Sequence, residues 1–334
     1  MINQTVYIIA EAGVNHNGQL DLALRLCDIA KESGADAVKF QTWKTEKIVT
    51  KKALLAEYQK ENLNGKSSQF EMLKRLELGY DEFAVLKEYC DKIGICFLST
   101  PDTEEDMDFL LELGMPVLKI GSGDVTNVPF LLNIGQRKQK VILSTGMSTL
   151  ADIEIAYNTL LESGATEVAL LHCTTNYPCP YDEVNLRAMN TIKQAFKCQV
   201  GYSDHTMGIE VPIAAVAMGA EIIEKHFTLD RNMEGPDHRA SLEPQELKRM
   251  VASIRNIEKA MGDGIKRPNA SEKKNAEVVL KRIIANSPIK KGEMLCESNL
   301  SLLRSSEGLP AKYWYLVAGK LATKDYQVDE PIEL

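Results

Sequence analysis

Two short runs organise the chain, Gly201-Tyr202-Ser203-Asp204-His205 and Glu224-Lys225-His226-Phe227. Each run closes an apolar stretch that predicts a buried strand, and residues 206–219 between them carry apolar side chains at helical spacing. A strand–helix–strand connection almost always makes its two strands parallel neighbours. The sequence therefore predicts that His205 and His226 lie at matching ends of adjacent strands, roughly 5 Å apart.

Two imidazoles at this separation can share one divalent metal ion, with oxygen ligands or water filling the rest of its shell. A histidine that stands alone is more simply explained as a core or surface residue bonded to a backbone carbonyl. This chain has only five histidines, and His205 and His226 occupy matching strand ends. We therefore interpret the pair as metal ligands.

The composition indicates a large globular protein. A chain of 334 residues, 44% of them apolar, can bury the core of one large domain and still leave a smaller one. The net charge of -8 argues against a nucleic acid or an anionic membrane as partner. No apolar run reaches the length that spans a bilayer, and the N-terminus lacks a basic-then-apolar export signal. The seven cysteines form no C-x-x-C pair and fit a reducing compartment, so we expect a cytoplasmic protein and assign the cysteines no chemistry.

Apolar runs and amphipathic stretches alternate along most of the chain. The expected strands are Val6–Gly13, Ala37–Thr42, Ile95–Pro101, Val117–Ser122, Val141–Gly146, Val168–Thr174, Gln199–His205 and Glu221–Phe227. The expected helices are Leu20–Ser33, Tyr80–Lys92, Glu104–Leu113, Pro129–Gln136, Leu150–Ser163, Leu186–Phe196, Ile209–Met218 and Pro244–Met261. This order predicts an α/β fold, a (β/α)8 TIM barrel. The rival, a doubly wound open sheet, would place a glycine-rich phosphate turn after the first strand, and residues 11–18 do not match that fingerprint.

Three segments depart from the barrel rhythm. The polar excursion Lys44–Glu71 follows the second strand, and a connection of that length is typical of a lid or a binding loop. Residues 266–280 are polar and predict a linker after a barrel of residues 1–265. Residues 281–334 alternate short apolar runs with turns, which predicts a small, mostly-β domain. That domain has little core of its own, so we expect it to lean on the barrel or on a second subunit.

Polar residues gather where the expected strands end. In a TIM barrel the C-terminal ends of the strands converge on one mouth, where active sites form. Reading each end in turn gives Glu11, Lys39, Gln41, Ser99, Thr100, Lys119, Ser122, Ser144, Thr145, His172, Thr174, Thr175, Ser203, His205, Glu224 and His226. Buried charges are costly unless they are partnered, so this set predicts a bound ligand.

Two of these residues are lysines inside apolar strands. Lys39 and Lys119 each need an anionic partner, and the hydroxyls and the Gly121-Ser122-Gly123 backbone around them suit a phosphate plus a carboxylate. The alternative is that the two lysines pair with Glu11 and Glu224 in the barrel core.

Two carboxylates are further candidates for chemistry. Glu11 closes the first strand, and beside a metal it could bind the ion, position a water or act as general base. Asp237 follows the last strand and could take a sugar hydroxyl or a metal-bound water. An N-cap or turn aspartate is an equal explanation for Asp237.

At these residues the chain resembles the sialic acid synthase family, which makes nine-carbon sugar acids. The resemblance runs nearly end to end and rests on residues 11–18, 39–42, 99–101, 119–123, 143–147, 171–174, 202–206, 224–227 and 235–238. Each motif alone is weak, but so many in the same order are specific. The tail, with Ile289-Lys290-Lys291-Gly292-Glu293 and Leu303-Arg304, is similar to the antifreeze-like (SAF) domain of that family.

The resemblance implies a reaction that uses both groups of candidate residues. Phosphoenolpyruvate would condense with the open-chain aldehyde of an N-acylated mannosamine-type sugar and release phosphate. His205 and His226 would hold a divalent ion, Mn²⁺ or alternatively Mg²⁺ or Co²⁺, that polarises the aldehyde. Glu11 would position the attacking water or manage protons there.

The resemblance also assigns the binding residues. The positions that match the phosphoenolpyruvate site are Lys39, Thr100, Lys119, Ser122, Ser144 and Ser203, and those that match the sugar site are Gln41, Tyr177 and Asp237. Arg304 matches an arginine that reaches the sugar's acyl group from the partner subunit, which implies a domain-swapped homodimer. The chain has Thr175 where many relatives carry asparagine, and we expect Thr175 to take the phosphate contact. The usual Arg-Pro-Gly is also replaced by Arg304-Ser305-Ser306.

Several products and functions are compatible with these residues. We favour N,N'-diacetyllegionaminate slightly over N-acetylneuraminate, and rank pseudaminate lower. A metal-dependent sugar isomerase or epimerase on a similar barrel would need more carboxylate ligands and no pair of lysines. A carbohydrate-binding module built on the small domain would leave the polar barrel mouth without a purpose.

Overall fold

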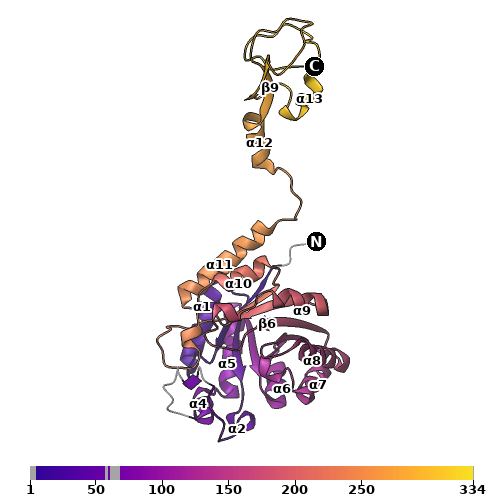
Figure 1. Ribbon diagram of the computed structural model, residues 1–334. Helices are drawn as coiled ribbons and strands as arrows, with labels where there is room; N and C mark the ends of the chain where they lie inside the picture. The colour runs from indigo at the N-terminus through magenta and orange to yellow at the C-terminus, as the bar shows by residue number, and fades with distance from the viewer. Residues whose placement is uncertain (1–4, 57–58, 61–67, 334) are drawn as a thin grey trace. The chain divides into compact units, whose positions relative to one another are not determined.

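The computed structural model describes residues 5–56, 59–60 and 68–333. The chain divides into two compact units, Met1–Gly262 and Asp263–Leu334. The first is a parallel barrel with helices outside its strands (Figure 1). The second is a small unit with its own apolar core.

Eight parallel strands form the first unit. They are β1 Tyr7–Gly13, β2 Ala37–Thr42, β3 Cys96–Pro101, β4 Leu118–Ile120, β5 Lys140–Ser144, β6 Glu167–Cys173, β7 Val200–Asp204 and β8 Ile222–His226. The hydrogen-bonded order is β3-β2-β1-β8-β7-β6-β5-β4, and the two outermost strands also lie in contact. The sheet therefore curls into a nearly closed barrel, which confirms the predicted (β/α)8 fold.

Helices follow the strands in the order that the sequence predicts. They are α1 Leu20–Glu32, α5 Tyr80–Ile93, α6 Glu104–Glu112, α7 Val128–Gln136, α8 Leu150–Ser163, α9 Ala188–Phe196, α10 Glu210–Ala217 and α11 Pro244–Met261, and they differ from the expected ranges only at their ends. Local chemistry sets those ends. Thr149 and Asp152 form a capping box at the start of α8. Gly94 ends α5 in the left-handed conformation, φ 72°, which favours glycine.

The strand register brings the polar strand ends together. Glu11 on β1 lies opposite Lys39 on one side and opposite His226 on the other. Gln41 lies opposite Thr100, and Ser203 lies opposite Glu224. The side chains predicted to meet at the mouth are thus placed on one end of the barrel by backbone pairing alone.

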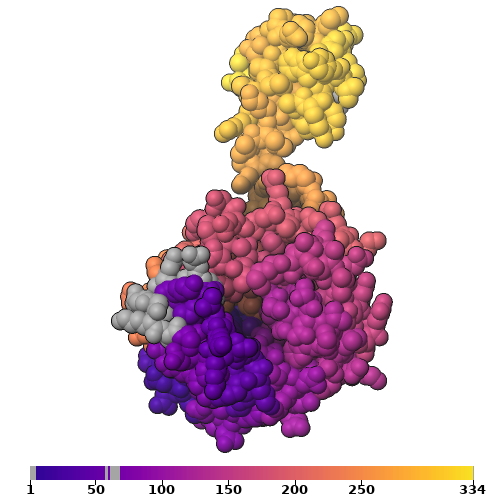
Figure 2. All heavy atoms as spheres, turned by 60° about the horizontal axis from the view of Figure 1, so that its bottom comes forward, coloured from indigo at the N-terminus to yellow at the C-terminus, as the bar shows by residue number. Residues whose placement is uncertain are grey.

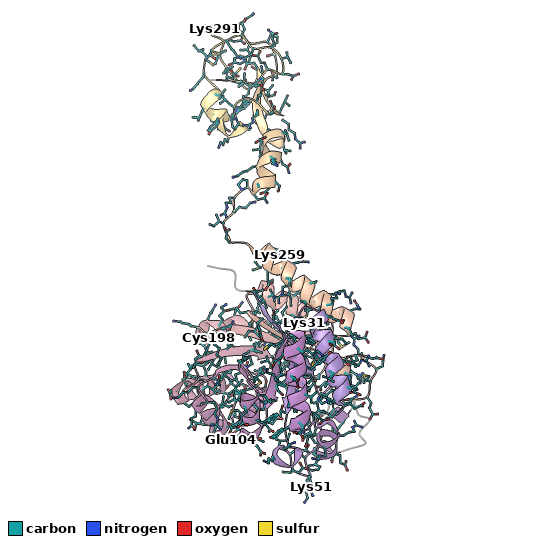
Figure 3. The ribbon with its side chains drawn as sticks, turned by 180° about the vertical axis from the view of Figure 1, so that it is seen from behind. Lys31, Lys51, Glu104, Cys198, Lys259 and Lys291 are labelled. Atoms are coloured by element: carbon teal, nitrogen blue, oxygen red, sulfur yellow. The ribbon has the colours of Figure 1, made fainter. Side chains whose placement is uncertain are left out.

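The two ends of the barrel can be followed in Figure 3. Lys51 and Glu104 follow the C-terminal ends of β2 and β3 and lie at the mouth end. Lys31 and Cys198 precede β2 and β7 and lie toward the other end, where Lys31 donates to the Gly94 carbonyl at 2.7 Å. No helix among the described residues combines the length and the apolar character needed to cross a bilayer.

The excursion between β2 and α5 is partly helical instead of being one long loop. It contains α2 Thr45–Ile48 and leads into α4 Gln69–Leu76, which Ser68 and Glu71 cap. A second small core holds it to the barrel mouth, formed by Val14, Trp43, Leu55, Met72 and Leu76. Part of the expected lid, residues 57–58 and 61–67, lies outside the described residues.

The second unit is built on an antiparallel pair, β9 Lys281–Ala285 and β10 Leu300–Arg304. Its buried residues are Ile283, Ile284, Ala285, Ile289, Leu295, Asn299, Leu300, Val317, Ala322, Tyr326 and Ile332. The short helix α13 Trp314–Val317 contributes Val317 to this core. Residues 266–280, which the sequence predicts as a linker, contain the helix α12 Ala270–Val279. Asn269 and Glu272 cap this helix. None of its residues is buried, so the sequence shows no apolar periodicity that would predict a helix there.

Candidate active site

A cavity of about 190 Å³ opens between the C-terminal ends of the strands. It is lined by Glu11, Lys39, Gln41, Thr100, Asp102, Lys119, Gly121, Ser122, Gly123, Ser144, Met147, Cys173, Thr175, Tyr177, Ser203, His205, Glu224 and His226. Figure 2 looks toward this end of the barrel, where the surface is hollowed between the purple and the magenta segments. Every strand therefore contributes through its own end or through the loop that follows it.

Two lysines and two glutamates form one buried network in the cavity. Lys39 Nζ lies 2.9 Å from Glu11 Oε2 and 3.7 Å from Glu224 Oε2, and it donates to Thr100 Oγ1 at 3.1 Å. Lys119 Nζ lies 3.5 Å from Glu224 Oε2. The sequence left open whether the two lysines bind an anionic ligand or pair with Glu11 and Glu224. The ion pairs are present, and the same lysines also line the cavity.

Hydroxyls and an amide complete the contacts of the network. Lys119 Nζ donates to Ser144 Oγ at 2.8 Å, and Ser203 Oγ donates to Glu224 Oε1 at 2.9 Å. Gln41 Nε2 donates to Glu11 Oε1 at 3.2 Å. The network thus ties together residues from seven strands, β1, β2, β3, β4, β5, β7 and β8.

Burial and pairing move the pKa values of these groups apart. Burial raises the pKa of Glu11 to about 7, although Lys39 opposes the shift. Burial would also raise the pKa of Glu224, but its pairing with Lys119 and Lys39 outweighs burial and lowers that pKa. Burial lowers the pKa of Lys119. Burial would also lower the pKa of Lys39, but Glu11 and Glu224 together outweigh it and raise that pKa above its ordinary value. Glu224 is therefore ionised at neutral pH, whereas Glu11 gains or loses its proton near neutral pH.

The two predicted metal ligands lie side by side at the ends of the adjacent strands β7 and β8 and both line the cavity. The rings of His205 and His226 lie 5.4 Å apart between centroids, with Tyr177 at 4.0 Å from the first and 5.5 Å from the second. Burial lowers the pKa of His205 to about 4 and the pKa of His226 well below its ordinary value. His205 Nδ1 lies 2.6 Å from the Thr174 carbonyl, which can only accept, so Nδ1 carries the proton and Nε2 keeps its lone pair. Both imidazoles are therefore neutral, the form that binds metals.

Two hydroxyls that line the cavity, those of Ser122 and Thr175, lie around Gly146. Gly146 donates its N–H to Ser122 Oγ at 2.9 Å, and Thr175 Oγ1 is buried without a hydrogen-bond partner. A Cβ added at Gly146 would lie 2.2 Å from Thr175 Oγ1. The glycine thus keeps open a small space beside an unsatisfied hydroxyl, which suits a hydrogen-bonding ligand.

Comparison with known proteins identifies the family to which this chain belongs. The NeuB family model matches residues 26–266. The chain belongs to the NeuB family of sialic-acid-type synthases. It is 52% identical to the N,N'-diacetyllegionaminic acid synthase of Campylobacter jejuni over 97% of this chain and 98% of that protein. It is 46% identical to the enzyme of the same name from Legionella pneumophila, over 96% of this chain and 91% of that one.

A solved structure of a NeuB-type protein is similar as well. The N-acetylneuraminic acid synthetase of Leptospira borgpetersenii, in complex with citrate, shares 38% identity and a TM-score of 0.72, covering 82% of this chain and 91% of that one. The family predicted from the sequence and its enzyme class, a sialic-acid-type synthase, are thus confirmed.

Most of the residues that the sequence predicts for the site of this NeuB member line the cavity. They are Glu11, Lys39, Gln41, Thr100, Lys119, Ser122, Ser144, Thr175, Tyr177, Ser203, His205 and His226. Asp237 does not line it but is buried behind His226, with Oδ2 3.8 Å from Nδ1. Arg304 lies on β10 in the second unit, so it is not among the residues that the barrel brings together.

Sequence reasoning gave Asp102, Met147 and Cys173 no role in the site, and it named Glu224 as a strand-end residue and as an alternative ion-pair partner of the lysines. Asp102 and Glu224 obey the strand period of two, since they stand two residues from Thr100 and from His226. That alternation is the signal that could have found them. Burial, together with charge repulsion from the nearby carboxylates of Asp124 and Asp106, raises the pKa of Asp102 to about 7. Met147 and Cys173 carry no comparable signal.

The histidine pair fits a metal ion. His226 Nδ1 is buried without a hydrogen-bond partner, and His205 presents a free Nε2 lone pair. No group of three His, Cys, Asp or Glu residues forms a ready metal site within the described part of the chain. Two protein nitrogens with Asp237 nearby would therefore leave positions for water or substrate.

Proposed function

We propose that the chain condenses phosphoenolpyruvate with the open-chain form of an N-acylated mannosamine-type sugar and releases phosphate. The observation that carries the proposal is a single cavity in which two buried lysines, a set of hydroxyls and two neutral histidines meet. An isomerase would need no such pair of lysines. The two relatives at 52% and 46% identity are both named N,N'-diacetyllegionaminic acid synthase, which supports a synthase reaction for this chain.

Phosphoenolpyruvate would occupy the lysine and hydroxyl side of the cavity. Its phosphate and carboxylate can accept from Lys39 and Lys119 through charge-assisted hydrogen bonds. The remaining donors would be Thr100, Ser122, Ser144, Thr175 and Ser203. The unpartnered Thr175 hydroxyl supports this assignment, because a ligand oxygen there would satisfy it.

The sugar would lie toward Gln41, Tyr177 and Asp237, with its acyl group held by Arg304 of a second subunit. The second unit exposes large apolar side chains, with Tyr315 91% and Leu316 61% exposed. Exposed apolar surface of this kind suits an interface, which supports a domain-swapped homodimer.

His205 and His226 would hold a divalent cation, Mn²⁺ before Mg²⁺ or Co²⁺. Such an ion would polarise the sugar's aldehyde oxygen. Asp237 Oδ2, near His226, would accept from a water in the remaining shell. All seven cysteines are free, which suits the reducing cytoplasm as the place of work.

Glu11 would manage the protons. Carbon 3 of phosphoenolpyruvate forms the new bond to the aldehyde carbon, whose oxygen takes up a proton. Water then adds at carbon 2 and gives up one proton. The tetrahedral intermediate breaks its C–O bond to phosphate, its remaining hydroxyl proton passes to the departing phosphate, and carbon 2 becomes a ketone. Because burial raises its pKa to about 7, Glu11 can accept the water's proton and pass it to the oxygen of the former aldehyde within one cycle.

We propose N,N'-diacetyllegionaminate as the product, before N-acetylneuraminate. The two legionaminic acid synthases are 52% and 46% identical to the chain, whereas a pseudaminic acid synthase of Campylobacter jejuni is 33% identical. Identity over nearly the whole chain favours the first sugar.

The test is phosphate release with phosphoenolpyruvate, Mn²⁺ and a panel of sugars. The panel includes 2,4-diacetamido-2,4,6-trideoxymannose and N-acetylmannosamine, with products identified by mass. We expect the highest kcat/KM with the diacetamido sugar. Silence with every sugar would remove the synthase proposal, and a preference for N-acetylmannosamine would change the product.

A further inference from the structure

Directly behind the two histidines lies an ion pair that the proposed reaction does not use. β7 and β8 are paired so that Asp204 lies opposite Lys225. Side chains alternate between the faces of a strand, and residues 203, 205, 224 and 226 line the cavity. Asp204 and Lys225 therefore point to the other side, away from the substrates, and both are completely buried.

Three residues join in this network. Lys225 Nζ donates to Asp204 Oδ2 at 2.5 Å and to the Thr206 carbonyl at 2.5 Å. Asp204 accepts in turn from the Thr206 N–H at 3.1 Å and from Thr206 Oγ1 at 3.0 Å. The residues before and after His205 are thus both tied to the residue before His226. The His205 carbonyl is held as well, since it accepts from the Cys179 N–H at 2.8 Å.

Stability does not explain this arrangement. Removing two charges from water costs about as much as their attraction returns, and an apolar pair of similar size often stabilises a fold equally well or better. What the charged pair adds is direction, because its hydrogen bonds fix the backbone on both sides of one imidazole relative to the other. A metal site requires its ligands within roughly 0.5 Å of their working positions.

We propose that the Asp204–Lys225 pair, completed by Thr206, is the positioning device of the histidine pair. It holds His205 and His226 at the separation that one ion bridges, without touching ion or substrate. The inference rests on the proposed function, in which these histidines bind the metal.

The decisive variant is the double substitution Asp204→Asn with Lys225→Met, which removes both charges at nearly unchanged size. Mn²⁺ affinity is measured by electron paramagnetic resonance without substrates, followed by kcat, both KM values and Tm. We expect Mn²⁺ affinity to fall about tenfold or more, the range known for residues behind metal ligands. We also expect kcat to fall at saturating Mn²⁺, the KM for phosphoenolpyruvate to stay within about twofold, and Tm to change little.

The matched control is Asp36→Asn. Asp36 Oδ2 accepts from Arg255 at 2.7 Å and from the Ile8 N–H at 2.7 Å, at the other end of the strands. This variant should lower Tm and leave Mn²⁺ affinity unchanged. Should the double variant not fold, Thr206→Val removes only the hydroxyl bond to Asp204, and it should weaken Mn²⁺ binding in the same direction.

Two outcomes overturn the inference. One is wild-type Mn²⁺ affinity and kcat in a folded double variant, or in Thr206→Val if only that one folds. The other is an equal loss of Mn²⁺ affinity in Asp36→Asn, which would make the effect one of general stability. Because the Mn²⁺ measurement needs no sugar, a wild type that binds Mn²⁺ but makes no sugar acid would remove the synthase proposal alone.

Discussion

Glu11 stands where opposing influences on a carboxyl group meet. Burial favours its neutral form, Lys39 favours its ionised form, and Glu224 again disfavours ionisation. The balance puts its pKa at about 7, whereas Glu224 nearby remains ionised. Two carboxylates in one cavity are thereby given different protonation behaviour, which is the usual basis for assigning acid–base roles.

From this pKa we predict the pH dependence of turnover. If ionised Glu11 accepts the water's proton, kcat/KM should rise as the pH is raised through about 7 and level off above it. Glu11→Gln should lower kcat about 100-fold or more and abolish that rise, with an unchanged circular dichroism spectrum. A wild-type profile that is flat from pH 6 to 8 would contradict the role of Glu11 as base.

For His205 we predict a loss of metal binding. Its substitution, His205→Ala, removes one of the two imidazoles, so Mn²⁺ should no longer be retained and turnover should fall to background. The matched control is His172→Gln, because His172 Nε2 is already bonded to the Val184 carbonyl at 2.9 Å. Equal Mn²⁺ retention by the wild type and His205→Ala, measured by equilibrium dialysis, would remove His205 from the metal site.

At the scale of elements, the site is a product of strand alternation. Lys39 and Gln41, Ser203 and His205, and Glu224 and His226 are spaced by two residues and share the inner face of the barrel. The segment between β2 and α5 depends on other forces. It is held by its small core and by Glu77, which accepts from the Thr45 N–H at 2.9 Å and from Thr45 Oγ1 at 2.7 Å.

The small core should be sensitive to truncation. Leu76 is 1% exposed in this core, and Leu76→Ala should lower the free energy of unfolding by about 2–5 kcal/mol. Leu54, in the same excursion, is 81% exposed, so Leu54→Ala should change that free energy by less than about 0.5 kcal/mol. Urea denaturation measures both, and equal effects would mean that the core does not anchor the excursion.

The elements also show how far the sequence could lead. The barrel strands and most lining residues follow from apolar runs and the strand period of two. Twelve of the fourteen site residues expected from the sequence line the cavity, and among these Tyr177 was expected only from the family resemblance. The helices α4 and α12 were missed because their polar faces resemble loops, although Ser68 with Glu71 and Asn269 with Glu272 are capping pairs. Asp102 was missed because the strand pattern was not continued past Pro101. The position of Arg304 relative to any cavity depends on packing between units, which no local pattern encodes.

At the scale of the whole molecule, each unit has a separate core. The smaller unit buries few residues and exposes Tyr315, Leu316 and Leu321. A unit of this size gains little stability alone. This is consistent with the proposal that it completes the site of a second copy through Arg304.

Subunit complementation tests that proposal. Chains with His205→Ala and chains with Arg304→Ala should each be impaired, the second mainly through a higher KM for the sugar. Co-expressed and purified as a mixed dimer, they should regain activity, because one barrel with intact histidines would receive an intact Arg304 from its partner. If Arg304 served its own barrel, the mixed dimer would be no more active than the Arg304→Ala chain.

The bare backbone at Gly146 has one more consequence. A methyl group there would come within 2.2 Å of the Thr175 hydroxyl oxygen and 3.0 Å of that of Ser122, so even alanine would behave as a built-in plug. The Gly146→Ala chain should fold but lose activity, because the added methyl group would occupy space that the substrate needs. Gly146 has no side chain that could be shortened further. Directed evolution toward bulkier substrates would therefore have to enlarge the cavity at other lining residues.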